Sequence, residues 1–251
     1  MDQPFTPNDI LSALRQSLNQ MAQWGCKGFA CSAAALATLE RWGQAPSHKP
    51  EGSSRATVGG GTGSAAALET LDAIRNDLGE CRRCGLHQHR TQIVFGEGNP
   101  KAQIIFIGHG PGVEEDHSGR PFVDGAGQLL DRIIEAMKLR RDQVYLCNIV
   151  KCCPKSELSP QAEEIKACRG FLTRQIVAIQ PKVICTLGTC ATQTLLDTTE
   201  PLAELHGRFH DQDGIKIMPT FHPADLLRQP ELKRAVWEDM KKVMAFLRIS
   251  L

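Results

Sequence analysis

The chain has 251 residues and a formal net charge of +1; 41% of its residues are hydrophobic and 23% are charged. This composition predicts a packed core rather than disorder, and it gives no sign of a chain that binds nucleic acid along its whole length. No apolar run approaches the roughly 20 residues of a transmembrane helix, and the acidic, polar N-terminus does not resemble a secretory signal. We therefore expect a cytoplasmic protein without a membrane partner, in which a local basic patch meets any anionic partner.

The sequence divides into a helical N-terminal part and a longer, more regular part. Apolar residues at helical spacing predict a helix over residues 6–24 and favour a second over 31–43. Residues 45–65 are rich in Gly, Ser and Pro without periodicity, which predicts a flexible linker. We therefore expect a helical extension over residues 1–44, a linker over 45–65 and a folded domain over 66–251.

The folded domain alternates short apolar runs with amphipathic helical patterns. The apolar runs predict strands over residues 103–108, 144–150, 182–188 and 215–221. Strands that alternate with helices form right-handed crossovers, so we expect a three-layer αβα sandwich with a central, mostly parallel four-stranded sheet. In such sheets ligands bind outside the carboxyl ends of the strands. The loops to search therefore begin at Gly108, Asn148, Gly188 and Phe221.

Five of the ten cysteines lie near the ends of predicted elements. Cys81 and Cys84 form a C-x-x-C pair, Cys152 and Cys153 follow the second strand, and Cys168 lies on the apolar face of the next helix. Disulfides are rare in the cytoplasm, so clustered cysteines indicate a metal site. Four thiolates suit either tetrahedral zinc or a [4Fe–4S] cluster. One of the five cysteines would then not be a ligand. The alternative is that Cys168 is only a small core residue.

A glycine-rich loop follows the first strand and reads GHGPGVEEDHSGRPFV from residue 108. It lacks the lysine of a P-loop, and Val113 stands where a Rossmann turn needs its third glycine, so it is no phosphate cradle. Glycine instead allows the backbone to approach a ligand closely. The same loop carries Phe122, while Asn148 and His222 end the second and fourth strands. A lone histidine is more often structural, but its place opposite an asparagine and a glycine loop favours a functional role.

The region from residue 68 to 248 resembles the type-4 uracil-DNA glycosylases, the iron–sulfur branch of the uracil-DNA glycosylase superfamily. The resemblance rests on an ordered set of motifs with matching spacing, which read CRRCGLHQHR, GHGPGVEEDHSGRPFV, VYLCNIVKCCP, EEIKACRGFL, PKVICTLG and MPTFHPADLLR. It implies a monofunctional DNA repair glycosylase that hydrolyses the N-glycosidic bond of uracil in single- or double-stranded DNA and leaves an abasic site. We expect a monomer that associates with the nucleoid through DNA.

The resemblance also assigns roles to individual residues. It implies a [4Fe–4S] cluster, with zinc as the second choice, held by Cys81, Cys84, Cys152 and Cys168. The loop that lines the uracil pocket comprises Gly108, Gly110, Pro111 and Gly112. Phe122 is expected to stack on the flipped base, Asn148 to read its hydrogen-bonding edge and His222 to lie beside uracil O2. The residues that match the loop entering the duplex are Leu226, Leu227 and Arg228.

Two positions depart from the family's usual pattern. Cys153 stands where the family usually carries a basic residue, so it competes with Cys152 as a ligand. His109 replaces the glutamate of the first motif, an acid thought to position or activate the attacking water. A neutral histidine, with an ordinary pKa of about 6.5, can act as a base at neutral pH. The other candidates are Glu115 and Asp116 from the next turn, and we expect slow uracil excision with a pH dependence set by His109.

Three alternatives stay open for the activity. His109 reshapes the pocket toward other deaminated bases such as hypoxanthine, or the loss of the acid leaves only a module that binds uracil-containing DNA. In the third, His109 attacks C1′ and traps the DNA covalently, as a cross-linking relative does with a histidine. That relative carries its histidine on an inserted basic loop that the segment CCPKSELSPQ lacks, so trapping is the weakest of the three.

Overall fold

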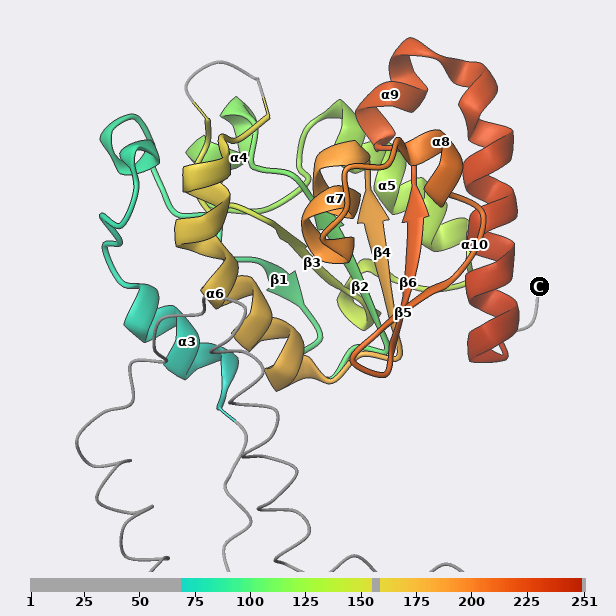
Figure 1. Cartoon of the computed structure of the whole chain (residues 1–251), viewed down its shortest axis with the longest axis horizontal. Helices are drawn as coiled ribbons and strands as arrows, with labels where there is room; N and C mark the ends of the chain where they lie inside the picture. Colours follow the sequence, from blue (N-terminus) through green and yellow to red (C-terminus); the bar gives the residue numbers. More distant parts are fainter. Residues whose placement is uncertain (1–68, 155–158, 250–251) are drawn as a thin grey trace, which may run out of the picture. The chain divides into compact units, whose positions relative to one another are not determined.

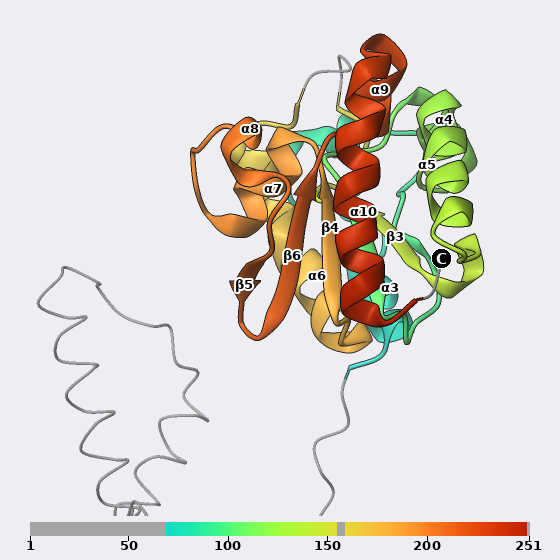
Figure 2. The same ribbon diagram turned by 90° about the vertical axis from the view of Figure 1, so that its right-hand side faces the viewer.

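The computed structural model describes residues 69–154 and 159–249, which form a central sheet with helices on both faces (Figures 1 and 2). The three-layer αβα arrangement predicted from the sequence is confirmed. The N-terminal helices expected over residues 1–44 and the linker expected over 45–65 lie outside the described residues. Within the described part, no helix combines the length and apolar character needed to span a membrane.

The sheet has six strands in the order β1-β3-β2-β4-β6-β5. Its centre consists of four parallel strands, which are β3 (Tyr145–Asn148), β2 (Ile104–Gly108), β4 (Val183–Leu187) and β6 (Ile215–Thr220). Two short antiparallel strands, β1 (Glu97–Gly98) and β5 (His210–Gln212), form the edges. The sequence predicted the four central strands but not the edges, because strands this short show no periodicity.

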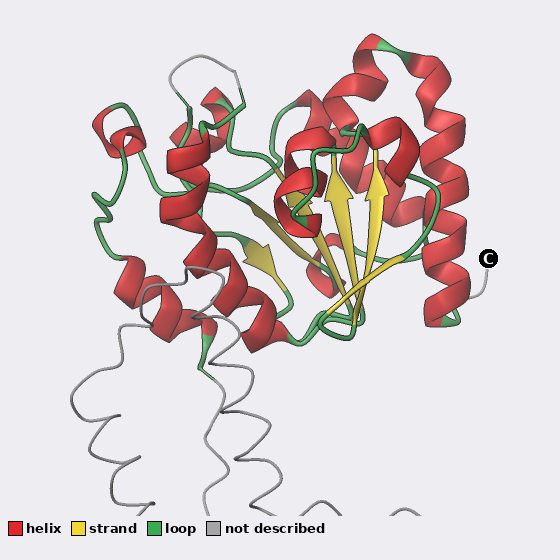
Figure 3. Ribbon diagram, in the orientation of Figure 1, coloured by secondary structure: helices red, strands yellow, loops and turns green. Residues whose placement is uncertain are grey.

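Helices pack on both faces of the sheet (Figure 3). One face carries α3 (Leu71–Leu78), α6 (Ala162–Ile179) and α7 (Thr189–Leu196). The other carries α5 (Gly125–Ala136), α9 (Pro223–Arg228) and α10 (Lys233–Leu247). The shorter helical segments are η1 (Gly85–Gln88), α4 (Val113–Ser118), η2 (Arg141–Gln143), α8 (Leu202–Leu205) and η3 (Pro230–Leu232).

Alternating side chains of the central strands build two separate cores. On β2, Ile104 and Phe106 pack with residues of α5 and α10, whereas Ile105 and Ile107 pack with residues of α6 and α7. Successive side chains of a strand point to opposite faces, so a strand covered on both faces must be apolar throughout. This explains the continuous apolar runs in the sequence.

The parallel strands end at the same edge of the sheet, and this edge positions the site (Figure 1). Gly108 at the end of β2 pairs in register with Asn148 at the end of β3. Leu187 at the end of β4 pairs with Thr220 at the end of β6. The loops that leave these four strand ends therefore meet above the sheet.

Candidate active site

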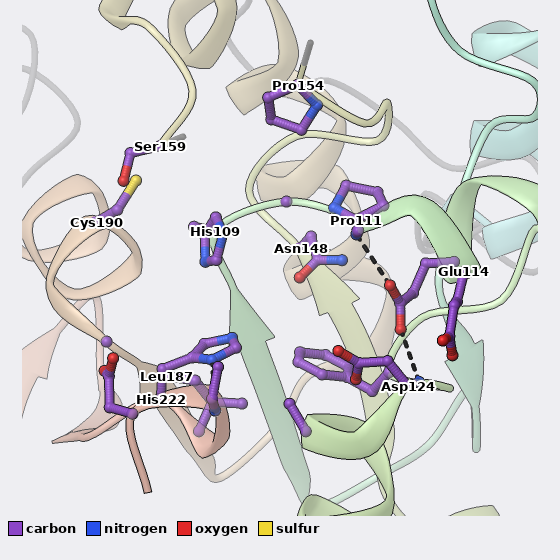
Figure 4. Close-up of a pocket in the computed structure, with 18 of the residues that line it drawn as sticks. His109, Pro111, Glu114, Asp124, Asn148, Pro154, Ser159, Leu187, Cys190 and His222 are labelled. Carbon is purple, nitrogen blue, oxygen red and sulfur yellow. Dashed lines mark hydrogen bonds between the residues drawn. The ribbon is translucent and has the colours of Figure 1, made fainter. Parts of the chain in front are cut away.

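A cavity of about 530 Å³ lies at the carboxyl ends of the parallel strands (Figure 4). Its lining brings together nine of the residues that the sequence singled out, which are His109, Gly110, Pro111, Gly112, Glu115, Phe122, Asn148, His222 and Arg228. It also includes residues without an expected role, among them Ser159, Thr189 and Cys190. The strand-end loops chosen from the sequence thus converge on one pocket.

Gly108 brings the end of β2 close to two other pocket elements. A Cβ atom on Gly108 would lie 2.5 Å from Asn148 Oδ1 and 2.8 Å from Phe122 Cζ. Real Cβ atoms do not approach other atoms so closely, so any side chain here would displace Asn148 or Phe122. The absence of a side chain at Gly108 is what allows these two residues to lie together beside the cavity.

Asn148 lines the cavity and carries a buried hydrogen-bond acceptor without a partner among the described residues. The residue is 2% exposed, and its Oδ1 atom has no hydrogen-bond partner among the described residues. A buried polar atom without a partner costs roughly 1–3 kcal/mol, so native proteins rarely keep one without a use. The Asn148 backbone carbonyl, in contrast, accepts a 2.8 Å hydrogen bond from Lys151 Nζ. The backbone is therefore anchored while the side chain is left for a ligand.

Phe122 is buried at the cavity in an uncommon backbone conformation. Its φ angle is 53°, in the left-handed region, and its ring centroid lies 6.2 Å from that of His222. Gly127 permits this arrangement, because a Cβ atom there would lie 2.1 Å from the Phe122 carbonyl carbon and oxygen. Non-glycine residues in this region are strained, and such strain is concentrated at functional sites.

His222 caps the N-terminus of α9, with Pro223 at the first helical position. Its Nδ1 atom accepts a 3.1 Å hydrogen bond from the backbone N–H of Ala224. Burial first, and the neighbouring His109 second, lower the pKa of His222 to about 4. The ring is therefore neutral at pH 7, and with Nδ1 acting as an acceptor its proton is on Nε2. His222 can thus donate a hydrogen bond while uncharged.

His109 forms the adjoining part of the cavity wall (Figure 4). The centroids of its ring and the His222 ring are 5.1 Å apart, with the planes tilted by 58°. Burial lowers the pKa of His109 from its ordinary value of 6.5, and Asp225 acts in the opposite direction. His109 is consequently a neutral imidazole at pH 7, able to accept a proton.

The two carboxylates expected as alternatives to His109 are engaged by backbone amides. Glu115 is 4% exposed; its Oε1 accepts hydrogen bonds from the N–H groups of Val123 and Asp124 at 2.8 and 3.1 Å. Its Oε2 accepts one from Gly112 at 3.0 Å. Asp116 does not line the cavity, and its Oδ2 accepts a 2.7 Å hydrogen bond from the N–H of Thr91. Glu115 therefore holds the loop together, which the sequence did not indicate.

The three residues expected to enter the duplex differ in exposure. Leu226 is 1% exposed and packs in the core beneath α9, so the structure does not support a DNA contact for it. Leu227 is 50% exposed, and Arg228 lies at the cavity with its guanidinium 2.6 Å from Asp225 Oδ1. A helix packed against a core must direct some of its consecutive residues inward, which the sequence motif alone did not reveal.

Comparisons with known proteins agree with this geometry. Residues 95–241 match the family model described as the Uracil DNA glycosylase superfamily. The chain belongs to this superfamily. It is 42% identical over 184 residues to the type-4 uracil-DNA glycosylase of Thermotoga maritima, covering 72% of this chain and 96% of that protein. It is also 40% identical over 185 residues to the type-4 enzyme of Sulfurisphaera tokodaii, covering 70% and 84%. A weaker similarity, 26% over 188 residues, relates it to the type-5 uracil-DNA glycosylase of Pyrobaculum aerophilum.

This uracil-DNA glycosylase superfamily member also has a second, smaller cavity near η1 and α6. Its lining includes the four cysteines expected as ligands, which are Cys81, Cys84, Cys152 and Cys168. Arg90 Nη1 lies 3.4 Å from the Cys152 sulfur, and Arg83 Nη1 lies 3.7 Å from the Cys81 sulfur. Cys153 does not line this cavity, and its sulfur is 3.5 Å from the Pro154 carbonyl oxygen. Cys152 is therefore the member of the pair that faces the other cysteines.

Zinc and a [4Fe–4S] cluster place different demands on such cysteines. Across residues 69–154 and 159–249, no group of three or more His, Cys, Asp or Glu side chains is arranged to hold a metal ion. A zinc ion needs its sulfur ligands about 2.3 Å from one centre, whereas each thiolate of a [4Fe–4S] cluster binds a different iron. The four cysteines that line this cavity supply the number of thiolates that either group uses.

Two cationic residues of this superfamily member, one buried and one partly buried, were not anticipated from the sequence. Lys151 is 1% exposed, and it contacts Asn148 while also lining the cysteine cavity. Arg141 contacts the backbone of the loop that carries Phe122. For Lys151, the sequence offers one signal, which is its position beside Cys152. For Arg141 it offers no signal, because a basic residue before a strand is common.

Proposed function

We propose that this protein is a uracil-DNA glycosylase that hydrolyses the N-glycosidic bond of uracil in DNA and leaves an abasic site. The observation that carries the proposal is the convergence of three groups on one cavity. They are an aromatic ring, Phe122; a buried amide oxygen without a partner, Asn148 Oδ1; and a neutral imidazole with its proton on Nε2, His222.

Base selection depends on Phe122 and Asn148. Chemistry on a base requires its removal from the stack, at a cost of roughly a few kcal/mol. Phe122 offers a face on which a flipped pyrimidine stacks. Asn148 Oδ1 accepts the N3–H of uracil while its amide NH₂ donates to O4. Cytosine lacks the N3 proton and opposes the NH₂ group with its own, so Oδ1 stays unpaired and the wrong base is rejected.

His222 stabilises the leaving base. As the glycosidic bond breaks, negative charge develops on uracil O2 and the sugar becomes oxocarbenium-like. A hydrogen bond from His222 Nε2–H to O2 strengthens as this charge grows, so it lowers the barrier rather than only tightening binding. A neutral donor also avoids placing a positive charge beside the developing oxocarbenium ion.

His109 activates the attacking water. Its lowered pKa keeps the ring neutral at pH 7, so that a ring nitrogen accepts a proton from water as the water attacks C1′. Glu115 and Asp116 already accept hydrogen bonds from backbone amides, which favours His109 over both of them. A protonated His109 would repel the oxocarbenium ion, so activity should require the neutral form.

We expect the exposed face of α9 to contact DNA. Leu227 is half-exposed and apolar, which suits it to fill the space that the flipped base leaves. Arg228 lies at the rim of the cavity, where a guanidinium can bind a phosphate of the damaged strand. The substrate is uracil-containing DNA, single- or double-stranded.

We further infer that Cys81, Cys84, Cys152 and Cys168 hold a [4Fe–4S] cluster. Four cysteines with arginine side chains directed at two of the sulfurs suit an anionic cluster. When bound, the cluster supplies a structural cross-link between the segment after α3, the loop after β3, and α6. Iron and acid-labile sulfide in the purified protein, with broad visible absorption, test this assignment; zinc alone would contradict it.

A single incubation separates the proposed function from its alternatives. Oligonucleotides with one uracil, one hypoxanthine or only normal bases are mixed with the protein, treated with alkali and resolved on a denaturing gel. Cleavage at uracil, absent in the Asn148→Ala variant, supports the proposal. Cleavage only at hypoxanthine, retention of DNA without cleavage, or a covalent protein–DNA adduct would each replace it with the corresponding alternative.

A further inference from the structure

The backbone of Phe122 is held by one arginine that does not line the cavity. Arg141 Nη1 donates a 3.1 Å hydrogen bond to the Phe122 carbonyl oxygen, and Nη2 donates one to the carbonyl oxygen of Pro121. The guanidinium thus binds two consecutive carbonyls at the point where the chain enters its left-handed conformation. Arg141 does not line the cavity and cannot touch a bound base.

The same guanidinium is fixed by two carboxylates from different elements. Arg141 Nε lies 2.7 Å from Glu97 Oε1 on β1, and Nη1 lies 2.6 Å from Asp131 Oδ1 on α5. The Arg141 side chain is 22% exposed, so these contacts are partly protected from solvent. Arginine is the residue suited to this task, because its planar fork presents five donors in a fixed geometry.

The residues after Phe122 are fixed separately. Glu115 Oε1 accepts hydrogen bonds from the N–H groups of Val123 and Asp124, and Gly127 leaves room for the Phe122 carbonyl. Arg141 therefore holds the carbonyl groups of Pro121 and Phe122, and Glu115 holds the amides of the two residues that follow. The strained backbone at Phe122 is fixed on both sides along the chain. Strained backbone persists only where surrounding contacts over-determine it.

We propose that Arg141 is a positioning residue that keeps Phe122 in the left-handed conformation needed to stack on the flipped base. The proposal rests on the proposed function, because it assigns Phe122 to base stacking. A loosened Phe122 weakens binding of the base in both the ground state and the transition state, so KM rises while kcat changes little.

The chain offers a matched control in Arg120. Arg120 also binds Glu97, with its Nε 2.8 Å from Oε2, but its side chain is 61% exposed and makes no hydrogen bond to the Phe122 backbone. The substitutions Arg141→Lys and Arg120→Lys each replace a guanidinium that contacts Glu97 with an ammonium group. Only the first removes the fork that binds Pro121 and Phe122.

The test compares these variants on a single-stranded uracil oligonucleotide. For Arg141→Lys we expect KM and the inhibition constant of free uracil to rise by about three- to tenfold, with kcat nearly unchanged. Arg120→Lys should match the wild-type protein. In a Phe122→Ala background, Arg141→Lys should add no further rise, because its effect passes through the ring. Unchanged constants in Arg141→Lys, an equal rise in Arg120→Lys, or full additivity would overturn the proposal.

A second measurement does not depend on activity. The ¹⁹F resonance of 4-fluorophenylalanine placed at position 122 should shift or broaden in Arg141→Lys and remain unchanged in Arg120→Lys. An unchanged resonance in Arg141→Lys would overturn the positioning role even if the variant were less stable. If the wild-type protein released no uracil, the proposed function would fail, and the fluorine resonance would still decide the role of Arg141.

Discussion

The imidazole rings of His109 and His222 lie 5.1 Å apart, centroid to centroid, in the wall of one cavity. Burial lowers the pKa of both rings, and His109 lowers the pKa of His222 further than burial alone does. The pocket therefore keeps two neutral imidazoles at physiological pH. One can accept a proton from water and the other can donate a hydrogen bond to the departing base.

The first prediction concerns His109 as the base. His109→Gln removes the proton acceptor, and we expect kcat to fall by roughly 100-fold, at the lower end of the range for general-base catalysis. The wild-type rate should be constant near pH 7 and fall as pH drops through the pKa of His109, which lies below 6.5. Single-turnover rates between pH 4.5 and 8 test this. A similar rate and pH profile in the variant would remove His109 from the water-activating role.

The second prediction links His222 to stability. The folded protein holds this ring neutral down to about pH 4, whereas the unfolded chain binds a proton near pH 6.5. As pH falls from 6.5 to 4 the unfolded state therefore gains protons that the folded state does not bind. The free energy of unfolding should decrease across this window by up to about 3 kcal/mol.

Urea unfolding at several pH values measures this contribution. In His222→Gln the decrease between pH 6.5 and 4 should be smaller than in the wild-type protein, and kcat should fall by roughly 100- to 1000-fold through loss of the donor to O2. Identical pH dependence of unfolding in both proteins would show that His222 is not held neutral by the fold.

The third prediction tests the close approach at Gly108. Gly108→Ala places a methyl group where Asn148 Oδ1 and Phe122 Cζ now lie, so we expect uracil release to be lost or reduced by at least about 100-fold. Gly170→Ala on α6 is the control, since no atom lies within 4 Å of its added Cβ and alanine favours a helix. The control should keep full activity and equal or higher stability. Normal activity in Gly108→Ala would mean that the strand end is not tightly packed against the pocket.

The fourth prediction distinguishes two adjacent cysteines. Cys152→Ser should lose bound iron and visible absorption, because Cys152 faces the other three cysteines. Cys153→Ser should retain both, since Cys153 lies outside that cavity. Iron analysis and absorption spectra of the two purified variants test this prediction. Loss of iron from Cys153→Ser alone would reverse the assignment.

The fold was largely predictable because its strands and helices carry strong apolar patterns. Every end of the four central strands agrees with the predicted runs to within two residues, and the glycine loop, Asn148 and His222 all reach one pocket. These features follow from strand order and from the rule that ligands bind at the carboxyl ends of parallel strands.

Other features depend on contacts between distant residues, which a sequence does not display. Glu115 was expected as a possible base but binds three backbone amides, and Leu226 was expected at DNA but lies in the core. Arg141 reaches a carbonyl 19 positions away in sequence, and no local pattern marks such a contact. The edge strands were missed because two or three residues have no periodicity.

The stretch from Asn148 to Cys152 serves the pocket and the cysteine cavity together. Asn148 faces the pocket, and Cys152 faces the other cysteines. Between them, Lys151 binds the Asn148 carbonyl through its side chain and lines the cysteine cavity together with Cys168. The two cavities therefore fix the number of residues between Asn148 and Cys152. An insertion or deletion of one residue between Asn148 and Cys152 would displace a pocket residue and a cysteine of the second cavity at once, so we expect this stretch not to tolerate a change in length even where its side chains are kept.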